Sequence, residues 1–460
     1  MNAGDRISQR AAIWIATLLF LVLPHRAAAE SSHIPNNVSF KNPSGAHATF
    51  TTNGEIDFKN EFFQNLGTNG RRCSTCHVPE DGWTIAPPDV QKRFAKTNGT
   101  DPIFRTNDGS NSPDADVSTV DARRAAYSML LSKGLIRVGI GIPMAGEFEL
   151  LAVDDPYGFA SAVELSLFRR PLPSTNLKFL STVMWDGRET FPGQTIHFDL
   201  SDQSNSATQG HAQGNPLTDA QRESIVAFET GLFTAQVKDD QAGDLTARHA
   251  LGGARNLAEQ DFYIGINDLF GDSETSAPFD PVVFTVYDAW KNLTGGGKNQ
   301  ARAAVARGEE LFNSKVIHIS GVSGINDEAA FGNPVVVNGS CTTCHDTPNS
   351  GNHSVSAPLD IGIADASRRT PDMPLYTLRN ITTGEIKTTT DPGRALITGL
   401  WKDIGRFKGP ILRGLAARAP YFHNGSAADL KAVIDFYDER FAIGFTDQEK
   451  ADLLAFLRTL

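Results

Sequence analysis

The chain has few of the features that mark several large protein classes. Only 4 of its 460 residues are cysteine, which excludes the disulfide-dense secreted scaffolds. Its 42 basic residues are outnumbered by 53 acidic ones, and the formal net charge of −11 argues against binding to nucleic acid or anionic membranes. Beyond residue 23 no apolar stretch is long enough to cross a bilayer, so we expect no transmembrane segment in the mature chain.

Residues 1–29 have the pattern of a cleaved signal peptide. Arg6 and Arg10 precede an apolar run over residues 11–23, and alanines at 27–29 provide a small-residue cleavage site. The alternative is an uncleaved anchor, although the run is short for a membrane span. We expect export to the periplasm. The leader carries three arginines and one aspartate, a net +2, so the mature charge changes from −11 to −13.

All four cysteines lie in two Cys-x-x-Cys-His motifs. These are Cys73–His77, which reads CSTCH, and Cys341–His345, which reads CTTCH. The pentapeptide is typical of haem c attachment, in which two thiols form thioethers to the porphyrin and the histidine ligates the iron. We therefore predict two covalent haems and two iron ligands, held by Cys73, Cys76 and His77 and by Cys341, Cys344 and His345.

Two other interpretations of the cysteine pairs are weaker. A structural zinc site needs four ligands at short spacing, whereas 265 positions (341 minus 76) separate the two pairs. A thioredoxin-like redox pair does not explain why histidine follows both pairs. Two haems on one chain therefore indicate redox chemistry.

The chain repeats one order of elements around each motif. Apolar helical patterns precede the motifs at residues 58–63 and 308–313, and capping boxes open later helices at Thr218 and Thr446. Each unit resembles a class I cytochrome c, in which a few short helices surround a haem. We predict a mainly α-helical fold with little β-structure, made of two cytochrome-c-like haem domains with long loops.

The flexible run Gly295–Gly297 predicts the boundary between these domains. It separates an N-terminal domain over residues 30–295 from a C-terminal domain over residues 296–460. The first domain has two long stretches that we expect to be irregular, residues 97–117 and 198–216. We interpret the first as surface decoration and the second as a candidate lining of the active site.

With the two haem motifs, the segments Trp185–Arg188 (WDGR) and Pro420–Gly425 (PYFHNG) resemble the bacterial dihaem cytochrome c peroxidase and MauG family. The resemblance implies that peroxide meets the N-terminal haem and that the C-terminal haem relays electrons. It also implies that Trp185 lies between the two haems. The alternative for Trp185 is an ordinary core indole.

The resemblance bears on the sixth ligand of the N-terminal haem. Many peroxidases of the family close this haem with a histidine about sixteen residues after the proximal one, and Arg93 holds that position here. No histidine lies between His77 and His197. We therefore expect an open or water-bound iron, as in MauG-like members, unless a distant histidine folds back.

For the C-terminal haem, the resemblance points to Tyr437 as distal ligand, where peroxidases of the family have methionine and MauG-like members have tyrosine. A phenolate stabilises ferric iron, so Tyr437 predicts a low-potential haem. Two alternatives stay open: a buried tyrosine that is merely hydrogen-bonded beside Val433 and Phe436, and ligation by Met373. We expect His423 beside the haem rather than on its iron.

Peroxide cleavage needs a group that moves a proton from one oxygen to the other. The family uses a glutamine and a glutamate after WDGR, but this chain has no glutamate between residues 189 and 223. The candidates are Gln203 and His211, with Gln194 and Asp202 as alternatives. His211 is equally compatible with a surface loop.

The family commonly holds calcium between its domains, bound by main-chain carbonyls that correspond to Arg418 and Pro420 and by an asparagine. Arg170 holds the asparagine position here, and an arginine is unfavourable beside a cation. Calcium is therefore a candidate cofactor whose occupancy the sequence leaves open.

These features predict a periplasmic dihaem c-type oxidoreductase that reduces hydrogen peroxide. Its electrons would come from a small cytochrome c or cupredoxin. One alternative is MauG-like oxidation of a partner protein or small molecule, which Tyr437 and the missing distal histidine favour. The other is a non-catalytic dihaem electron carrier, which only the missing glutamate favours.

Overall fold

The computed structural model describes residues 32–460. The predicted signal peptide lies outside the described residues. Within residues 32–460, no helix combines the length and the apolar character that crossing a membrane requires. The predicted domain boundary at Gly295–Gly297 stays a prediction.

The described residues form ten α-helices, several of which begin at side-chain caps. Thr218 and Thr446 each accept a hydrogen bond from the main chain three residues on, and a glutamine and a glutamate complete the predicted capping boxes. The helices are α1 (Pro87–Thr97), α2 (Val120–Ala126), α3 (Ser128–Lys133), α4 (Ile196–Gly210), α5 (Asp219–Thr230), α6 (Ala254–Ala258), α7 (Lys298–Ser314), α8 (Ala395–Thr398), α9 (Leu430–Phe441) and α10 (Asp447–Leu457).

Thirteen strands of the described residues form five small sheets, all with antiparallel neighbours. The sheet orders are β1-β4, β10-β11, β13-β12-β6, β2-β3-β8-β9 and β5-β7. The strands are β1 (His33–Pro35), β2 (Ser39–Asn42), β3 (Gly45–Thr51), β4 (Glu55–Asp57), β5 (Ile136–Ile140), β6 (Phe148–Asp154), β7 (Leu165–Arg169), β8 (Leu232–Asp239), β9 (Gly243–Asp244), β10 (Ile317–Ile319), β11 (Val337–Gly339), β12 (Leu375–Asn380) and β13 (Ile386–Thr389).

The prediction of a mainly helical fold with little β-structure is therefore wrong. The chain is 31% helical and 17% strand. The physical reason is that the two largest sheets depend on partners far away in the sequence, since β6 pairs with β12 and β3 with β8. Strand formation depends on these neighbours more than on intrinsic preference, so a local search for helical periodicity misses it.

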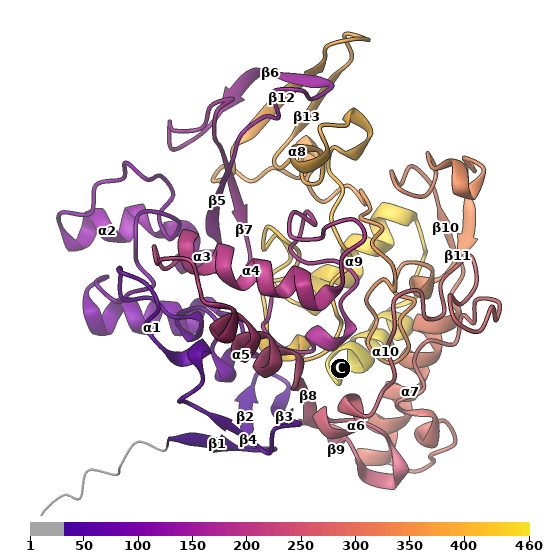
Figure 1. Ribbon diagram of the computed structural model, residues 1–460. Coiled ribbons are helices and arrows are strands. Elements are labelled where there is room, and N and C mark those ends of the chain that lie inside the picture. The colour runs from indigo at the N-terminus through magenta and orange to yellow at the C-terminus, as the bar shows by residue number, and fades with distance from the viewer. Residues whose placement is uncertain (1–31) are drawn as a thin grey trace, which may run out of the picture. The chain divides into compact units, whose positions relative to one another are not determined.

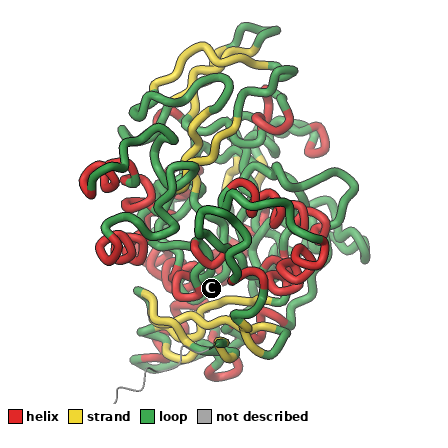
Figure 2. The backbone as a smooth tube through the Cα atoms, turned by 60° about the vertical axis from the view of Figure 1, so that its left-hand side comes forward, coloured by secondary structure: helices red, strands yellow, loops and turns green. Residues whose placement is uncertain are grey.

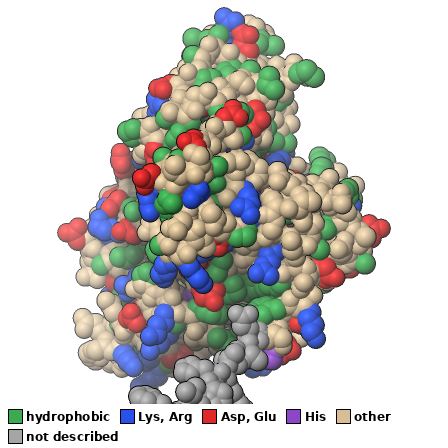
Figure 3. Space-filling view, turned by 90° about the vertical axis from the view of Figure 1, so that its left-hand side faces the viewer, with side chains coloured by type: hydrophobic (Ala, Val, Ile, Leu, Met, Phe, Trp, Pro, Cys, Tyr) green, Lys and Arg blue, Asp and Glu red, His purple; other side chains and the backbone are tan. Residues whose placement is uncertain are grey.

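Figures 1 and 2 show most of the helices between two groups of strands, with the sheet β10-β11 at one side. The sheets β5-β7 and β13-β12-β6 lie at one end, and the sheet β2-β3-β8-β9 lies at the other. On the face over α1 and α2, basic and acidic side chains are interspersed rather than gathered by sign (Figure 3). The haem motifs lie in the helical middle.

An aromatic core packs beside each haem motif. Phe62, Trp83 and Phe228 pack together beside the first motif, and Phe284, Phe312 and Phe456 pack together beside the second. The helix expected over residues 58–63 is only a 3-10 turn, Glu61–Phe63, whereas residues 308–313 belong to α7 as predicted.

Helices α7 and α10 approach closely at one glycine of the second core. A Cβ atom on Gly308 would lie 2.0 Å from the carbonyl oxygen of Asp452, so only glycine fits there. This contact fixes α10 against the helix that leads into the second haem motif.

Candidate functional site

Both Cys-x-x-Cys-His motifs adopt the same backbone conformation. Cys73–Thr75 and Cys341–Thr343 form single 3-10 turns, each closed by a threonine hydroxyl that accepts a main-chain hydrogen bond at 3.0 Å. Burial raises the pKa of the Cys73, Cys341 and Cys344 thiols to about 12 and also raises that of Cys76. Unbridged, these thiols would therefore stay protonated and inert.

The two motif histidines are oriented in the same way. Nδ1 of His77 lies 3.0 Å from the Trp83 carbonyl oxygen, and Nδ1 of His345 lies 2.6 Å from the Gly351 carbonyl oxygen. Because a carbonyl only accepts, Nδ1 must carry the proton, which leaves the lone pair of Nε2 free for a metal. Burial lowers the pKa of both imidazoles, that of His77 to about 4, so both are neutral near pH 7.

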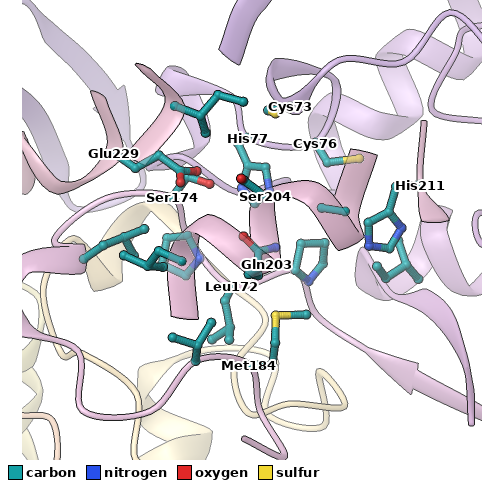
Figure 4. Close-up of a pocket in the computed structure, with 18 of the residues that line it drawn as sticks. Cys73, Cys76, His77, Leu172, Ser174, Met184, Gln203, Ser204, His211 and Glu229 are labelled. Carbon is teal, nitrogen blue, oxygen red and sulfur yellow. The ribbon is translucent and has the colours of Figure 1, made fainter. Parts of the chain in front are cut away.

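A cavity of about 180 Å³, the first cavity, opens beside the first motif. Figure 4 shows His77 pointing into it, with Gln203 and Ser204 of α4 facing the imidazole. The wall also includes Cys73, Cys76, Leu172, Ser174, Met184, Trp185, Arg188, His211, Glu229, Lys408 and Arg418.

A second cavity of about 200 Å³ opens beside the second motif. Its wall is mainly aliphatic and aromatic, contributed largely by the segments around β10, α9 and α10. Polar groups are few and include His345, His353, Lys408, His423 and Tyr437. A dry, apolar wall with a few placed polar groups is typical of a cofactor site.

Trp185 lines both cavities. Its indole Nε1 donates to the Arg170 carbonyl oxygen at 2.8 Å, and its own carbonyl oxygen accepts from the main chain of Lys408 at 2.9 Å. The ring also lies edge-on to His423, with centroids 6.2 Å apart. The indole is thus fixed in the wall that the two cavities share.

A buried ion cluster holds the segment that carries Trp185. Arg169 pairs with Asp186 at 2.5 Å and with Asp391 at 2.7 Å, and all three side chains are almost fully buried. Although burial opposes ionisation, the guanidiniums of Arg169 and Arg188 lower the pKa of Asp186 to about 2. This cluster ties residues 169–186 to the segment at 391.

His211 is held by a carboxylate at the edge of the first cavity. Its Nδ1 lies 2.5 Å from Asp108, which also pairs with the buried Arg71. The His211 side chain is 40% exposed, so it reaches both the cavity and solvent. Asp108 lies in the stretch 97–117, so the interpretation of that stretch as surface decoration is wrong.

Gln203 and His211 both come from the stretch 198–216. The expectation that this stretch is irregular is wrong. Thr195 accepts from the Phe198 main chain and starts α4, which contains most of this stretch. Gln203 points into the first cavity (Figure 4). The two alternatives do not line it: Gln194 is exposed, and Asp202 is half-buried outside the wall.

Arg93 does not enter the first cavity. It pairs with Asp101 at 2.5 Å and donates to the Thr75 carbonyl oxygen at 2.7 Å, which supports the haem-motif turn from outside. Met184 is the thioether among the residues of this wall, and its backbone is left-handed with φ 68°. Sequence reasoning missed Met184 because it considered only histidine at this site.

Tyr437 lines the second cavity with its hydroxyl unpaired. Among the hydrogen bonds of residues 32–460 none involves this hydroxyl, whereas the ring packs against Phe436 and Phe441. Burial raises its pKa, so only a bound cation would make it a phenolate. Met373 instead packs with Met129, Leu135 and Phe168 in a separate core and is not part of the cavity wall.

His423 and His353 are buried in the wall of the second cavity. His423 stacks on Phe407 with centroids 3.9 Å apart, and its Nε2 has no hydrogen-bond partner among the described residues. The same holds for Nδ1 of His353. Burial lowers the pKa of both to about 4. Both imidazoles are therefore neutral near pH 7, and Nδ1 of His353 lies 3.3 Å from a carboxyl oxygen of Asp346.

Glu229 of α5 is a further buried acid in the first cavity that sequence reasoning missed. It is 5% exposed, and one of its carboxyl oxygens has no partner among the described residues. Burial raises its pKa to about 7, although a hydrogen bond with Ser174 opposes the shift. No local signal identifies Glu229, because it lies on an ordinary amphipathic helix beyond residues 189–223, where a glutamate was expected.

The residues expected near calcium do not fit that ion. The guanidinium of Arg170 is buried and donates to the carbonyl oxygens of Lys133 at 3.0 Å, Ile85 at 2.7 Å and Arg418 at 3.2 Å. The main-chain carbonyl of Arg418 is one of the two that the resemblance assigns to calcium. A fixed cation of this chain already occupies that position.

We therefore expect the protein to be indifferent to calcium chelation. EGTA should leave the melting temperature and the visible spectrum unchanged, because Arg170 supplies the positive charge. The variant Arg170→Asn, which creates an amide beside the same carbonyls, should melt lower in EGTA and recover with added calcium. A wild-type melting temperature that falls in EGTA would contradict this assignment.

Comparisons with known proteins agree with the haem motifs. No family model matches the chain. The cytochrome-c peroxidase IdrP1 of Pseudomonas sp. (strain SCT) is 28% identical over 194 residues, 38% of this chain and 43% of that protein. The cytochrome-c peroxidase IdrP2 of Denitromonas iodatirespirans is 30% identical over 132 residues, 26% of this chain and 36% of that protein.

The chain thus spans less than half the length of these curated relatives. Among solved structures, a MauG-like protein associated with microbial copper homeostasis is 19% identical, and the alignment covers 94% of this chain and 93% of that one. Its TM-score is 0.37, which is too low for the two folds to be equated.

Proposed function

We propose that this chain, whose motifs resemble those of the dihaem cytochrome c peroxidase and MauG family, is a dihaem c-type oxidoreductase that reduces hydrogen peroxide. The observation that supports this most is the pairing of two cavities. Each lies beside a Cys-x-x-Cys-His motif whose histidine presents a free Nε2, and Trp185 lines both.

The donor set of each cavity fits haem c. Two thiols could form thioethers to the porphyrin, and a neutral imidazole could ligate the iron. The buried polar atoms of Glu229 and His423 that lack a hydrogen-bond partner among the described residues agree with cavities built to hold a polar cofactor. When bound, haem supplies an iron that exchanges electrons and that can take peroxide at an open position.

In this proposal the residues of the first cavity handle protons. Reduction of peroxide to water consumes protons and electrons in equal number, so a proton source must face the cavity. His211 can donate and regain a proton at Nε2 while Asp108 keeps Nδ1 protonated and the ring oriented. The Gln203 amide can hold the peroxide by a hydrogen bond.

Electrons would reach the first cavity from the second through the contact at Trp185. We propose that a small cytochrome c or cupredoxin supplies them in the periplasm. The acidic chain, with a formal net charge of −11, favours a basic carrier.

The test is peroxide turnover by the purified holoprotein with a reduced small cytochrome c. His211→Ala should lower turnover by about 10²-fold, the usual contribution of a positioned acid–base group. His197→Ala is the matched control: this exposed histidine on the same helix pairs with Glu223, lies outside the first cavity, and should leave turnover unchanged. Equal rates for both variants would remove His211 from the proposed role.

MauG-like oxidation of a partner protein is the second candidate function. The unpaired hydroxyl of Tyr437 in the second cavity favours it, because a phenolate ligand would stabilise oxidised iron. Fast peroxide turnover with reduced cytochrome c supports the peroxidase, whereas peroxide reactivity without such turnover supports the MauG-like enzyme. A non-catalytic electron carrier with both irons capped would show neither peroxide turnover nor a reaction with peroxide.

A further inference from the structure

Lys408 is a buried lysine placed between the two cavities. It lines both of them and is 7% exposed. Its main-chain N–H donates to the Trp185 carbonyl oxygen at 2.9 Å, and its Nζ donates to the Thr182 carbonyl oxygen at 2.9 Å. Backbone contacts with the WDGR region therefore fix the position of this ammonium group.

The ammonium of Lys408 has no anionic partner among the described residues. Other partly buried lysines pair with carboxylates, such as Lys133 with Asp372 at 2.7 Å and Lys387 with Asp360 at 3.2 Å. Lys408 has one carbonyl acceptor for three N–H donors. Burial without a counter-ion lowers its pKa to about 7, a cost that proteins normally avoid by pairing the charge.

The walls of the two cavities differ sharply in charge. The first cavity is lined by several arginines, of which Arg169 and Arg188 already pair with Asp186. In the wall of the second cavity Lys408 is the single lysine, arginine or carboxylate. A negatively charged group entering the second cavity would therefore have this one side chain as its fixed cationic partner.

We propose that Lys408 is a counter-ion, shared by the two cavities, for carboxylate groups of the cofactors that they hold. The inference rests on the proposed function, since haem carries two propionate carboxylates. One Nζ can donate to a carboxylate from each side while keeping its bond to Thr182. Lys408 is thus a binding and positioning residue common to both centres rather than a catalytic one.

Replacing Lys408 should change the redox midpoint potentials of both haems together. A buried positive charge disfavours ferric haem, which carries one more positive charge than ferrous haem. Removing the ammonium also leaves carboxylates unpaired, which stabilises ferric iron further. Both midpoint potentials should therefore fall together in Lys408→Met, and Lys408→Arg should keep most of the wild-type values.

The experiment is an optical redox titration of the holoprotein and its variants, with both haems counted as pyridine haemochrome. Lys178→Met is the matched control, because Lys178 also donates to a main-chain carbonyl, that of Gln260 at 2.6 Å, but lines neither cavity. It should shift neither potential. A fall confined to one haem in Lys408→Met, or no fall with both haems in place, would overturn the shared role.

Resonance Raman spectroscopy of the haem propionate bending modes gives a second readout on the wild-type protein alone. Carboxylates paired with an ammonium should shift these bands on transfer to D₂O, and unshifted bands would overturn the proposal even if Lys408→Met does not fold. A wild-type protein without haem would instead refute the proposed function itself, so the two failures are distinguishable.

Discussion

Replacing Cys73 and Cys76 together with alanine should leave one haem per chain and lower peroxide turnover by about 10³-fold or more. The loss is large because the variant no longer anchors the cofactor of the first cavity, and the remaining side chains cannot substitute for an iron. The mass of the intact protein and the pyridine haemochrome spectrum report haem content. Stopped-flow consumption of peroxide with a reduced small cytochrome c reports turnover.

The matched variant replaces Cys341 and Cys344 with alanine. It should also retain one haem and lose steady-state turnover, because electrons no longer pass through the second cavity. It should nevertheless keep the spectral change on mixing with peroxide, since the first cavity is intact. If this variant loses the spectral change while the Cys73/Cys76 variant keeps it, the proposed roles of the two centres are reversed.

The variant Arg169→Met should destabilise the protein by about 3–5 kcal/mol. It leaves Asp391 buried without its arginine partner and leaves Asp186 with Arg188 alone, and an uncompensated buried charge is among the costliest single changes. Chemical denaturation of wild type and variant measures the difference. Arg379→Met is the control: Arg379 and Glu149 form an ion pair whose side chains are each nearly half exposed, so its loss should cost about 1 kcal/mol or less.

The ion cluster of Arg169, Asp186 and Asp391 also predicts how the stability of the fold depends on pH. The pKa of Asp186 is about 2 in the folded chain, below the value of about 4 for a free aspartate. Its contribution to stability is therefore complete above pH 4 and is lost as the pH falls through 2. In Arg169→Met the buried carboxyls should favour protonation, so stability should rise as the pH falls toward 4 and should not fall further between pH 4 and 2. Equal pH profiles for both proteins would contradict the pairing.

Local signals in the sequence predict local features well. The haem motifs fold into matching turns, and the capping boxes at Thr218 and Thr446 start α5 and α10, because these structures depend on residues within one or two turns. Trp185 lines both cavities, and its position between two haems stays a prediction. These features need no knowledge of distant contacts.

Features that depend on distant contacts were predicted poorly. The β-structure was missed because strands such as β6 and β12 find each other across the chain. Asp108, Glu229 and Lys408 were missed because their importance comes from burial, which a single sequence does not display. Met373 is the alternative to Tyr437 as distal ligand, yet its side chain fills a separate core.

The pairing of Phe148–Asp154 with Leu375–Asn380 has a consequence for how the protein is assembled. Both strands must be out of the ribosome before their sheet can form, and closing so long a loop is slow. We expect an emerging chain whose first thiols, at Cys73 and Cys76, stay accessible well before the last strand arrives. Such a delay suits the proposed export and covalent attachment of haem, which both require an unfolded chain.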